Sequence, residues 1–192
     1  SSSPAVAARC AHARAGVGAV ASQNVTDPAL GPMLLDLMEA GATARAAIDQ
    51  VAGSAPHIVY RQLTAVDAAG GSAVYSGARS LGINGDVVRP GLVCAGNLLA
   101  SLDVLAAMAD AFEQATGPLG DRLIRAMQAA LAAGGEAGPV HSAGLKLVRE
   151  MSWPVADLRC DWTEDCPIAA VERAWDVYKP QLSAYVQRAL DP

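Results

Sequence analysis

The chain has 192 residues, of which 52% are hydrophobic, 17% are charged and 4% are aromatic. This length and apolar content predict one folded domain over residues 1–192 and exclude an intrinsically disordered protein. The formal net charge of −5, without a basic run, argues against nucleic-acid binding, and no apolar run is long enough to predict a membrane span.

The first half of the chain alternates between predicted strands and helices. Asp27-Pro28 has the pattern of a helix start, an acidic cap followed by proline at the first helical position. Thr43 is a second candidate cap, two residues after Gly41, which ends the preceding helix. The expected elements are a buried strand, two helices and a β-hairpin, over residues 16–23, 27–41, 43–53, and 58–66 with 73–77.

The second half begins with a loop rich in Gly, Asn and Asp, over residues 82–91. The elements expected after it are a short strand, two helices, two strands and a last helix, over residues 92–97, 101–112, 119–131, 142–149, 155–161 and from 167 onward. The apolar stripes of the two middle helices are expected to be buried: Leu102, Leu105, Met108 and Phe112, then Leu119, Leu123, Ile124, Met127 and Leu131. Pro180 is expected to kink or split the last helix.

The order of these elements predicts a layered fold. Helices arrive in pairs between groups of antiparallel strands, and the apolar residues are mostly small. Two sheets stacked face to face, with helix pairs outside, would bury these faces. The expected fold class is therefore α+β.

The four cysteines, Cys10, Cys94, Cys160 and Cys166, form no C-x-x-C pair and match no usual zinc spacing. We expect free thiols rather than a disulfide or a metal site, which favours a cytoplasmic location. No cofactor and no metal is predicted. Three carboxylates, Asp157, Asp161 and Asp165, are expected to form a polar rim rather than a cation site.

The first residue of the sequence is a serine. An N-terminal serine carries a hydroxyl nucleophile and an α-amine with a reference pKa of about 7.7–8.0. The neutral amine can accept the hydroxyl proton, as it does in N-terminal-nucleophile hydrolases. The alternative is that Ser1 is the trimmed end of a loose tail.

Several segments, in order along the chain, resemble a widespread and poorly characterised bacterial family of proposed N-terminal-nucleophile (Ntn) hydrolases. They are Ala13-Arg14-Ala15-Gly16-Val17-Gly18-Ala19-Val20-Ala21-Ser22-Gln23, Asp27-Pro28-Ala29-Leu30-Gly31, Arg61-Gln62-Leu63, Ala95-Gly96-Asn97-Leu98-Leu99, His141-Ser142-Ala143 and Asp157-Leu158-Arg159.

This resemblance implies a four-layer αββα sandwich. It also implies a precursor in which a short leading segment, a β-hairpin, precedes a serine that aligns with Ser1. Autocatalytic cleavage would then release Ser1 as the first residue. The leader would remain as a short partner chain or leave a sheet edge open.

The polar residues nearest to predicted strand ends are the candidate site residues. Ser1 would be the nucleophile and Asn97 an oxyanion donor, with a turn residue as the alternative reading of Asn97. Gln23 could bind substrate or orient the amine, and Asn24 is a weaker version of the same idea. Both can also be satisfied strand-end amides.

Three charged or titratable residues complete the candidate set. Arg61 could bind a substrate carboxylate, or form an ion pair with Asp67 or Asp157. His141, after a flexible glycine run, could line the cleft or simply be exposed. His12 could replace the amine as the base.

The predicted function is a self-processed N-terminal-serine amidohydrolase. It would cleave a small non-peptide amide, such as a lactam or an N-acyl compound, through an acyl-enzyme. The alternative is a non-catalytic binding or assembly protein on the same scaffold. A homodimer is the expected assembly.

Overall fold

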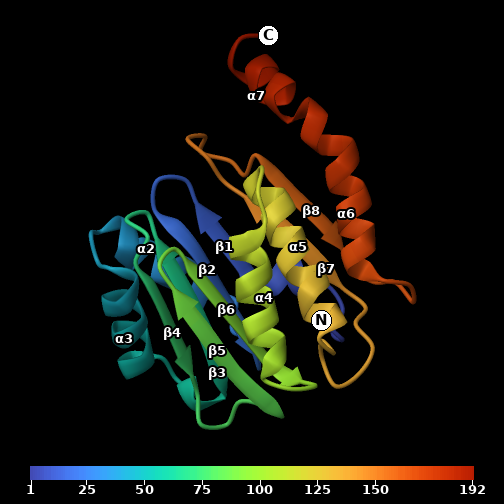
Figure 1. Ribbon diagram of the computed structural model, residues 1–192. Coiled ribbons are helices and arrows are strands. Elements are labelled where there is room, and N and C mark those ends of the chain that lie inside the picture. The colour runs from blue at the N-terminus through green and yellow to red at the C-terminus, as the bar shows by residue number, and fades with distance from the viewer.

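A computed structural model describes residues 1–192 as a mixed α+β chain with antiparallel sheets (Figure 1). Its strands are β1 (Ala11–Arg14), β2 (Gly18–Asn24), β3 (Arg61–Asp67), β4 (Ser72–Ser76), β5 (Ile83–Arg89), β6 (Leu92–Leu99), β7 (Ala143–Leu147) and β8 (Ala156–Cys160). Its α-helices are α1 (Val6–Cys10), α2 (Leu30–Glu39), α3 (Ala44–Ser54), α4 (Asp103–Gln114), α5 (Leu119–Ala132), α6 (Pro167–Tyr178) and α7 (Leu182–Leu190). Two short 3₁₀ helices, η1 (Ile58–Tyr60) and η2 (Lys179–Gln181), precede β3 and α7.

Strands β1 to β4 form one antiparallel sheet in chain order, and helices α2 and α3 pack against one face of it. The alternation of β3 explains this arrangement, because neighbouring residues of a strand point to opposite faces. Leu63 and Ala65 join the buried cluster that includes Leu34 and Ile48 of the helices. Gln62, the residue before Leu63, faces the opposite way and bonds to the carbonyls of residues 85 and 96.

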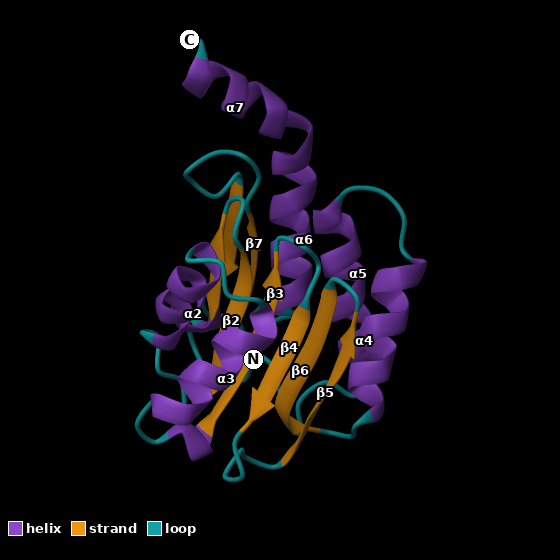
Figure 2. Cartoon of the chain, turned by 90° about the vertical axis from the view of Figure 1, so that its left-hand side faces the viewer, coloured by secondary structure: helices purple, strands orange, loops and turns teal.

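The other four strands form two antiparallel pairs, β5–β6 and β7–β8. Helix α4 contacts both strands of the first pair, and helices α5 and α6 contact the second. Leu123 of α5 packs against the apolar clusters of both pairs, so one helix spans them. Both pairs also contact the sheet of β1 to β4: β6 contacts β3, and β7 contacts β1. Figure 2 shows the strands between α2 and α3 on one side and α4 and α5 on the other.

Two of the predicted helix boundaries are confirmed, the start at Thr43 and the break at Pro180. The Thr43 hydroxyl accepts a hydrogen bond from the Ala46 amide at 3.2 Å, and α3 begins at the next residue. Asp27 accepts from the Ala29 amide, but α2 begins at Leu30 without a side-chain cap, so the start predicted at Asp27-Pro28 was two residues early. Pro180 lies in the 3₁₀ turn η2, which separates α6 from α7. Helix α7 projects from the body of the molecule in Figure 1.

Three elements were missed from the sequence. Helix α1 has only five residues and no side-chain cap, and β1 follows it directly, so neither has a strong local signal. Strand β5 occupies the predicted loop over 82–91. Its Gly85 and Asp86 are poor strand formers, and the strand exists because β6 pairs with it through an irregular register.

The predicted apolar stripes of α4 and α5 were partly wrong. Leu105 and Phe112 are buried, but four of the expected core side chains are 39–57% exposed: Leu102, Leu119, Met127 and Leu131. Helix α5 instead buries small residues with Ile124: Gly120, Ala126 and Ala130. Small side chains let α4 and α6 approach closely, which a search for large apolar residues does not detect.

No helix of the structure has the length and apolar character needed to cross a membrane.

Gly120 of α5 lies against Trp175 of α6, and this contact yields a stability prediction. A Cβ atom at Gly120 would lie 2.5 Å from the Trp175 ring, which is only 3% exposed. We expect Gly120→Ala to lower the free energy of unfolding by about 1–3 kcal/mol through overpacking, measured by urea denaturation.

Gly53→Ala is the matched control. Gly53 also lies in a helix, and a Cβ atom there would meet no atom within 4 Å. This variant is expected to gain about 0.5–1 kcal/mol because alanine favours the helix. Equal effects of the two substitutions would contradict the close contact with Trp175.

Candidate active site

Ser1 lies beside the start of β7, where it pairs with Ser142. The Ser1 amine donates to the Ser142 carbonyl at 2.7 Å, and the Ser142 amide donates to the Ser1 carbonyl at 3.0 Å. This exchange of two bonds is that of a hydrogen-bonded pair in an antiparallel ladder. The His141 amide also donates to the Ser1 carbonyl, at 2.8 Å. The structure therefore brings two predicted site residues, Ser1 and His141, together.

The side chains of this pair are held in different ways. The buried Ser142 hydroxyl donates to the Ser3 carbonyl and accepts from the Val6 amide. The Ser1 side chain is 25% exposed, and its hydroxyl accepts from the Ser3 amide at 3.2 Å. Of the two hydroxyls, that of Ser1 is the one open to an incoming molecule.

Glu136 is the acidic neighbour of the Ser1 amine. One of its carboxylate oxygens lies 3.7 Å from the amine, and the other accepts from the Ser2 amide at 3.0 Å. Burial lowers the pKa of the Ser1 α-amine below its ordinary value of 8.0, while the charge of Glu136 acts in the opposite direction. Because burial has the larger effect, the neutral amine is available at a lower pH than in a free peptide.

The imidazole of His141 has a defined tautomer. Its Nδ1 lies 2.8 Å from the Thr163 carbonyl, which can only accept, so Nδ1 carries a proton and Nε2 is the basic atom of the neutral ring. The ring stacks on Trp162 with centroids 4.2 Å apart.

Two other candidates, Gln23 and Asn97, meet at a buried amide. Gln62 has no exposed surface, and its Oε1 accepts from Gln23 Nε2 at 2.7 Å and from Asn97 Nδ2 at 3.4 Å. Its own Nε2 lies 3.0 Å from the Ser76 hydroxyl. This amide cluster lies between β2, β3 and β6. Neither Gln23 nor Asn97 is hydrogen-bonded to Ser1.

Asn24 and Arg61 lie opposite each other in the β2–β3 ladder. Asn24 has a left-handed backbone with φ of 76°, and its side chain bonds to the Tyr60 carbonyl and to the Leu81 amide. Arg61 donates to the Val25 carbonyl, and no carboxylate contacts it. The expected alternative, an ion pair with Asp67 or Asp157, is wrong.

Both of those carboxylates have other partners. The Asp67 carboxylate accepts from the backbone amides of Ala44, Ala69 and Gly71, with the Ala44 bond at 2.8 Å. These bonds lower the pKa of Asp67, the Ala44 bond most strongly. Asp157 pairs with Lys146 at 3.1 Å. Asp161 pairs with Arg159 at 2.9 Å. The carboxylates near β8 are thus engaged with cations of the chain.

His12, the proposed alternative base, lies elsewhere. Its ring packs against Gly31 of α2, where an added Cβ would approach Cδ2 to 2.1 Å. Its Nε2 lies 3.4 Å from the Arg9 carbonyl, and no hydrogen bond joins it to Ser1. Burial lowers the pKa of His12.

Sequence reasoning missed Glu136, Thr163 and Gln62 as parts of these clusters. Glu136 follows a glycine pair in a segment expected only to end a helix, and nothing local connects it with the first residues. Gln62 did carry a signal, because it is a polar residue within the predicted strand over 58–66, directly before the apolar Leu63.

The position of Glu136 predicts how the Ser1 amine titrates in a chain that begins at Ser1. Replacing Glu136 by Gln removes the negative charge that favours the protonated amine. We expect the titration midpoint of the amine to move to lower pH, followed through the ¹⁵N shift of serine-labelled protein.

Glu150→Gln is the control, because Glu150 is exposed and forms no ion pair with Ser1. It should leave the midpoint in place. A midpoint that rises, or does not move, in Glu136→Gln would contradict the assignment of Glu136 as the partner of the amine.

Comparison with known proteins places these features in a family. The model of a family of unknown function, DUF1028, matches residues 1–171. The crystal structure of protein SPO2555 from Silicibacter pomeroyi, which carries the same family label, superposes with a TM-score of 0.87 at 28% sequence identity. The match covers 93% of this chain and 77% of that chain. No curated protein matches significantly. The chain therefore belongs to the DUF1028 family.

Proposed function

We propose that this protein is a hydrolase of small non-peptide amides, such as lactams or N-acyl compounds, with the Ser1 hydroxyl as nucleophile and the Ser1 α-amine as base. The observation that carries the proposal is the pairing of the two groups on one residue: a partly exposed hydroxyl and a buried amine whose pKa is lowered. The mechanism requires a mature polypeptide whose first residue is Ser1.

The reaction would run in two halves. The Ser1 Oγ forms a bond to the amide carbonyl carbon while its proton passes to the neutral amine. The tetrahedral intermediate then breaks its C–N bond, and the ammonium returns the proton to the leaving amine. Water hydrolyses the resulting ester by the same proton route and restores Ser1.

The amide cluster at Gln62 would supply polar contacts. Asn97 donates one hydrogen to Gln62 and keeps a second, which is the proposed donor to the oxyanion. Gln23 also donates to the Gln62 side-chain oxygen, and we propose that it contacts the substrate. Asn24 and His141 are proposed to border the site.

Three variants test this mechanism with p-nitroanilides of acetic and phenylacetic acid as probes. Ser1→Ala should abolish turnover and the acyl-enzyme seen by mass spectrometry. One glycine retained ahead of Ser1 should lower kcat/KM at least ~100-fold, because it removes the basic amine. His12→Ala should have a far smaller effect.

The pH profile provides a second readout. Activity needs the neutral amine, so kcat/KM should rise with pH through a midpoint below 8.0, the direction in which burial moves this pKa. An active glycine-extended protein together with an inactive His12→Ala variant would exclude the amine as the base.

The alternative candidate is a non-catalytic binding or assembly protein. The two backbone bonds between Ser1 and Ser142 favour this candidate, because they give the main chain of Ser1 a role in holding the fold together. Absence of any acyl-enzyme with either probe, combined with unchanged stability of Ser1→Ala, would support this candidate.

We also infer that the layers form an αββα sandwich completed by a leader segment. Strands β6 and β7 contact the same sheet at β3 and β1 but are not paired with each other, and α1 contacts both β2 and β7. The backbone pair between Ser1 and Ser142 lies directly before β7, whose outer edge is free in the described sheets. Residues that precede Ser1 could extend this antiparallel pairing along β7, so a leader segment would pair with that edge.

The leader gives a processing prediction for a longer precursor of this chain. After cleavage, mass spectrometry of the purified complex should show two species, the leader and the chain from Ser1. Ser1→Ala should leave the precursor uncut, because the same hydroxyl would drive the N→O acyl shift. Efficient cleavage of Ser1→Ala would assign processing to another protease.

A homodimer remains a prediction, as does a cytoplasmic location. The four free cysteines are the feature that supports the latter.

A further inference from the structure

The segment that carries Glu136 is fixed to the end of β6 through its backbone. The Ala100 amide donates to the Gly135 carbonyl at 3.0 Å, and the Ala137 amide donates to the Leu98 carbonyl at 2.7 Å. Between these two bonds, Glu136 itself forms an isolated antiparallel bridge with β6. The backbone position of Glu136 is therefore set by contacts that are independent of Ser1.

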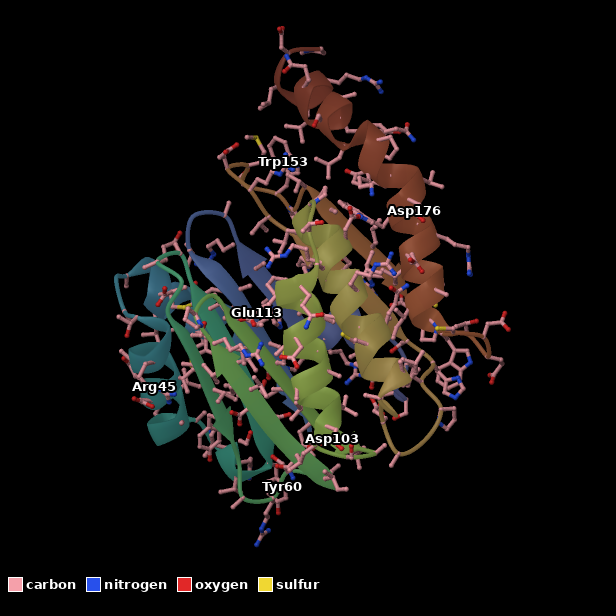
Figure 3. The ribbon with its side chains drawn as sticks, in the orientation of Figure 1. Arg45, Tyr60, Asp103, Glu113, Trp153 and Asp176 are labelled. Carbon is pink, nitrogen blue, oxygen red and sulfur yellow. The ribbon has the colours of Figure 1, made fainter.

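The Glu136 carboxylate reaches the nitrogen atoms of both Ser1 and Ser2. One oxygen lies 3.7 Å from the Ser1 nitrogen, and the other accepts from the Ser2 amide at 3.0 Å. Beyond this end of β6 the chain enters α4, whose first residue, Asp103, is labelled in Figure 3, and Figure 1 shows the N-terminus in the same half of the molecule, away from α7. The Glu136 side chain is 19% exposed, so water can reach the carboxylate while the Ser2 amide holds it beside Ser1.

Self-cleavage of a precursor needs a different base from the mature reaction, and this inference rests on the proposed function. In the precursor, the Ser1 nitrogen belongs to a peptide bond. It still has an N–H that can donate to the Ser142 carbonyl, but its lone pair is delocalised over the amide and cannot accept the hydroxyl proton. Another group must therefore act as the base of self-cleavage.

Glu136 is the only acidic side chain within 4 Å of the Ser1 nitrogen. Cys10, the other titratable side chain that acts on the amine, is buried. The His12 ring packs on α2, and the His141 ring is stacked on a tryptophan with its Nδ1 on a backbone carbonyl. Position and charge thus single out the Glu136 carboxylate among the possible bases.

We propose that Glu136 is the general base of self-cleavage. The Ser1 Oγ forms a bond to the carbonyl carbon of the residue before Ser1, while its proton passes to the Glu136 carboxylate directly or through one water. The C–N bond then breaks, and the Ser1 nitrogen takes the proton back from Glu136. This leaves an ester on Ser1, which water hydrolyses to a free carboxyl group on the leader and a free hydroxyl on Ser1.

The same carboxylate has the opposite effect once the amine is free. In the mature chain it favours the protonated amine, which cannot accept a proton from the hydroxyl. Glu136 therefore promotes processing and opposes turnover at low pH. A residue with only a structural role would not produce effects of opposite sign in the precursor and in the mature chain.

The first test measures self-cleavage of the precursor by mass spectrometry over time. Glu136→Gln should be cleaved at least ~100-fold more slowly than the wild type, because it lacks the base. Glu136→Asp keeps a carboxylate and should be cleaved faster than Glu136→Gln. Glu164→Gln is the control, since Glu164 lies 3.8 Å from the His141 ring but forms no ion pair with Ser1, and it should be cleaved at the wild-type rate.

The second test bypasses self-cleavage. A protease site placed directly before Ser1 lets an added protease produce the mature chain from each variant. Mature Glu136→Gln should hydrolyse the p-nitroanilides with its kcat/KM profile moved to lower pH, because the amine loses the charge that favours its protonated form. A loss of activity at every pH would instead assign Glu136 a structural role and overturn the proposal.

The outcomes separate this inference from the proposed function. Wild-type cleavage of the Glu136→Gln precursor, with the Ser1→Ala precursor uncut, would overturn the role of Glu136 alone. Cleavage of the Ser1→Ala precursor would overturn both the processing mechanism and this role. Slow cleavage of the Glu136→Gln precursor together with a mature wild type that hydrolyses no p-nitroanilide would contradict the hydrolase and support Glu136 as the base of processing.

Discussion

The buried amide of Gln62 is the contact on which the relative position of the strand groups depends. It lies on β3 without any exposed surface and reaches the carbonyls of Gly85 and Gly96 on the facing pair of strands, each at 3.2 Å. It also bonds to Ser76 and Gln23 in its own sheet. A buried amide is costly unless it is bonded, so a shift of one strand group past the other would break several bonds at once.

This constraint shapes the region around the candidate site. Gln62 bonds to the Gly96 carbonyl in β6, and two residues later in the same strand Leu98 has a left-handed conformation. The Leu98 carbonyl accepts from the Ala137 amide at 2.7 Å, which positions the segment that carries Glu136. Glu136 then meets Ser1 and Ser2. The acidic partner of the Ser1 amine is therefore placed by a series of contacts that begins in the sheet interface.

The helices and the first hairpin could be predicted because their signals are local. A cap residue such as Thr43 acts on an amide three residues away, and proline at 180 cannot continue a helix in any environment. The two halves of the hairpin, β3 and β4, also follow from alternation and a glycine-rich turn. Strand β5 could not be predicted in this way, because its stability comes from pairing with β6 rather than from its own residues.

The sequence by itself determined the class of the fold, most of the element order and the chemical types available for a site: a serine with two reactive groups, amides at strand ends, and an arginine in a predicted strand. Only the tertiary structure decided which of them meet. Ser1 contacts Ser142 and Glu136, both more than 130 positions away, while the nearby His12 packs on Gly31 instead. The physical reason is that caps and turns act within a few residues, whereas a site is assembled by strand pairing and burial, which act between segments of any separation.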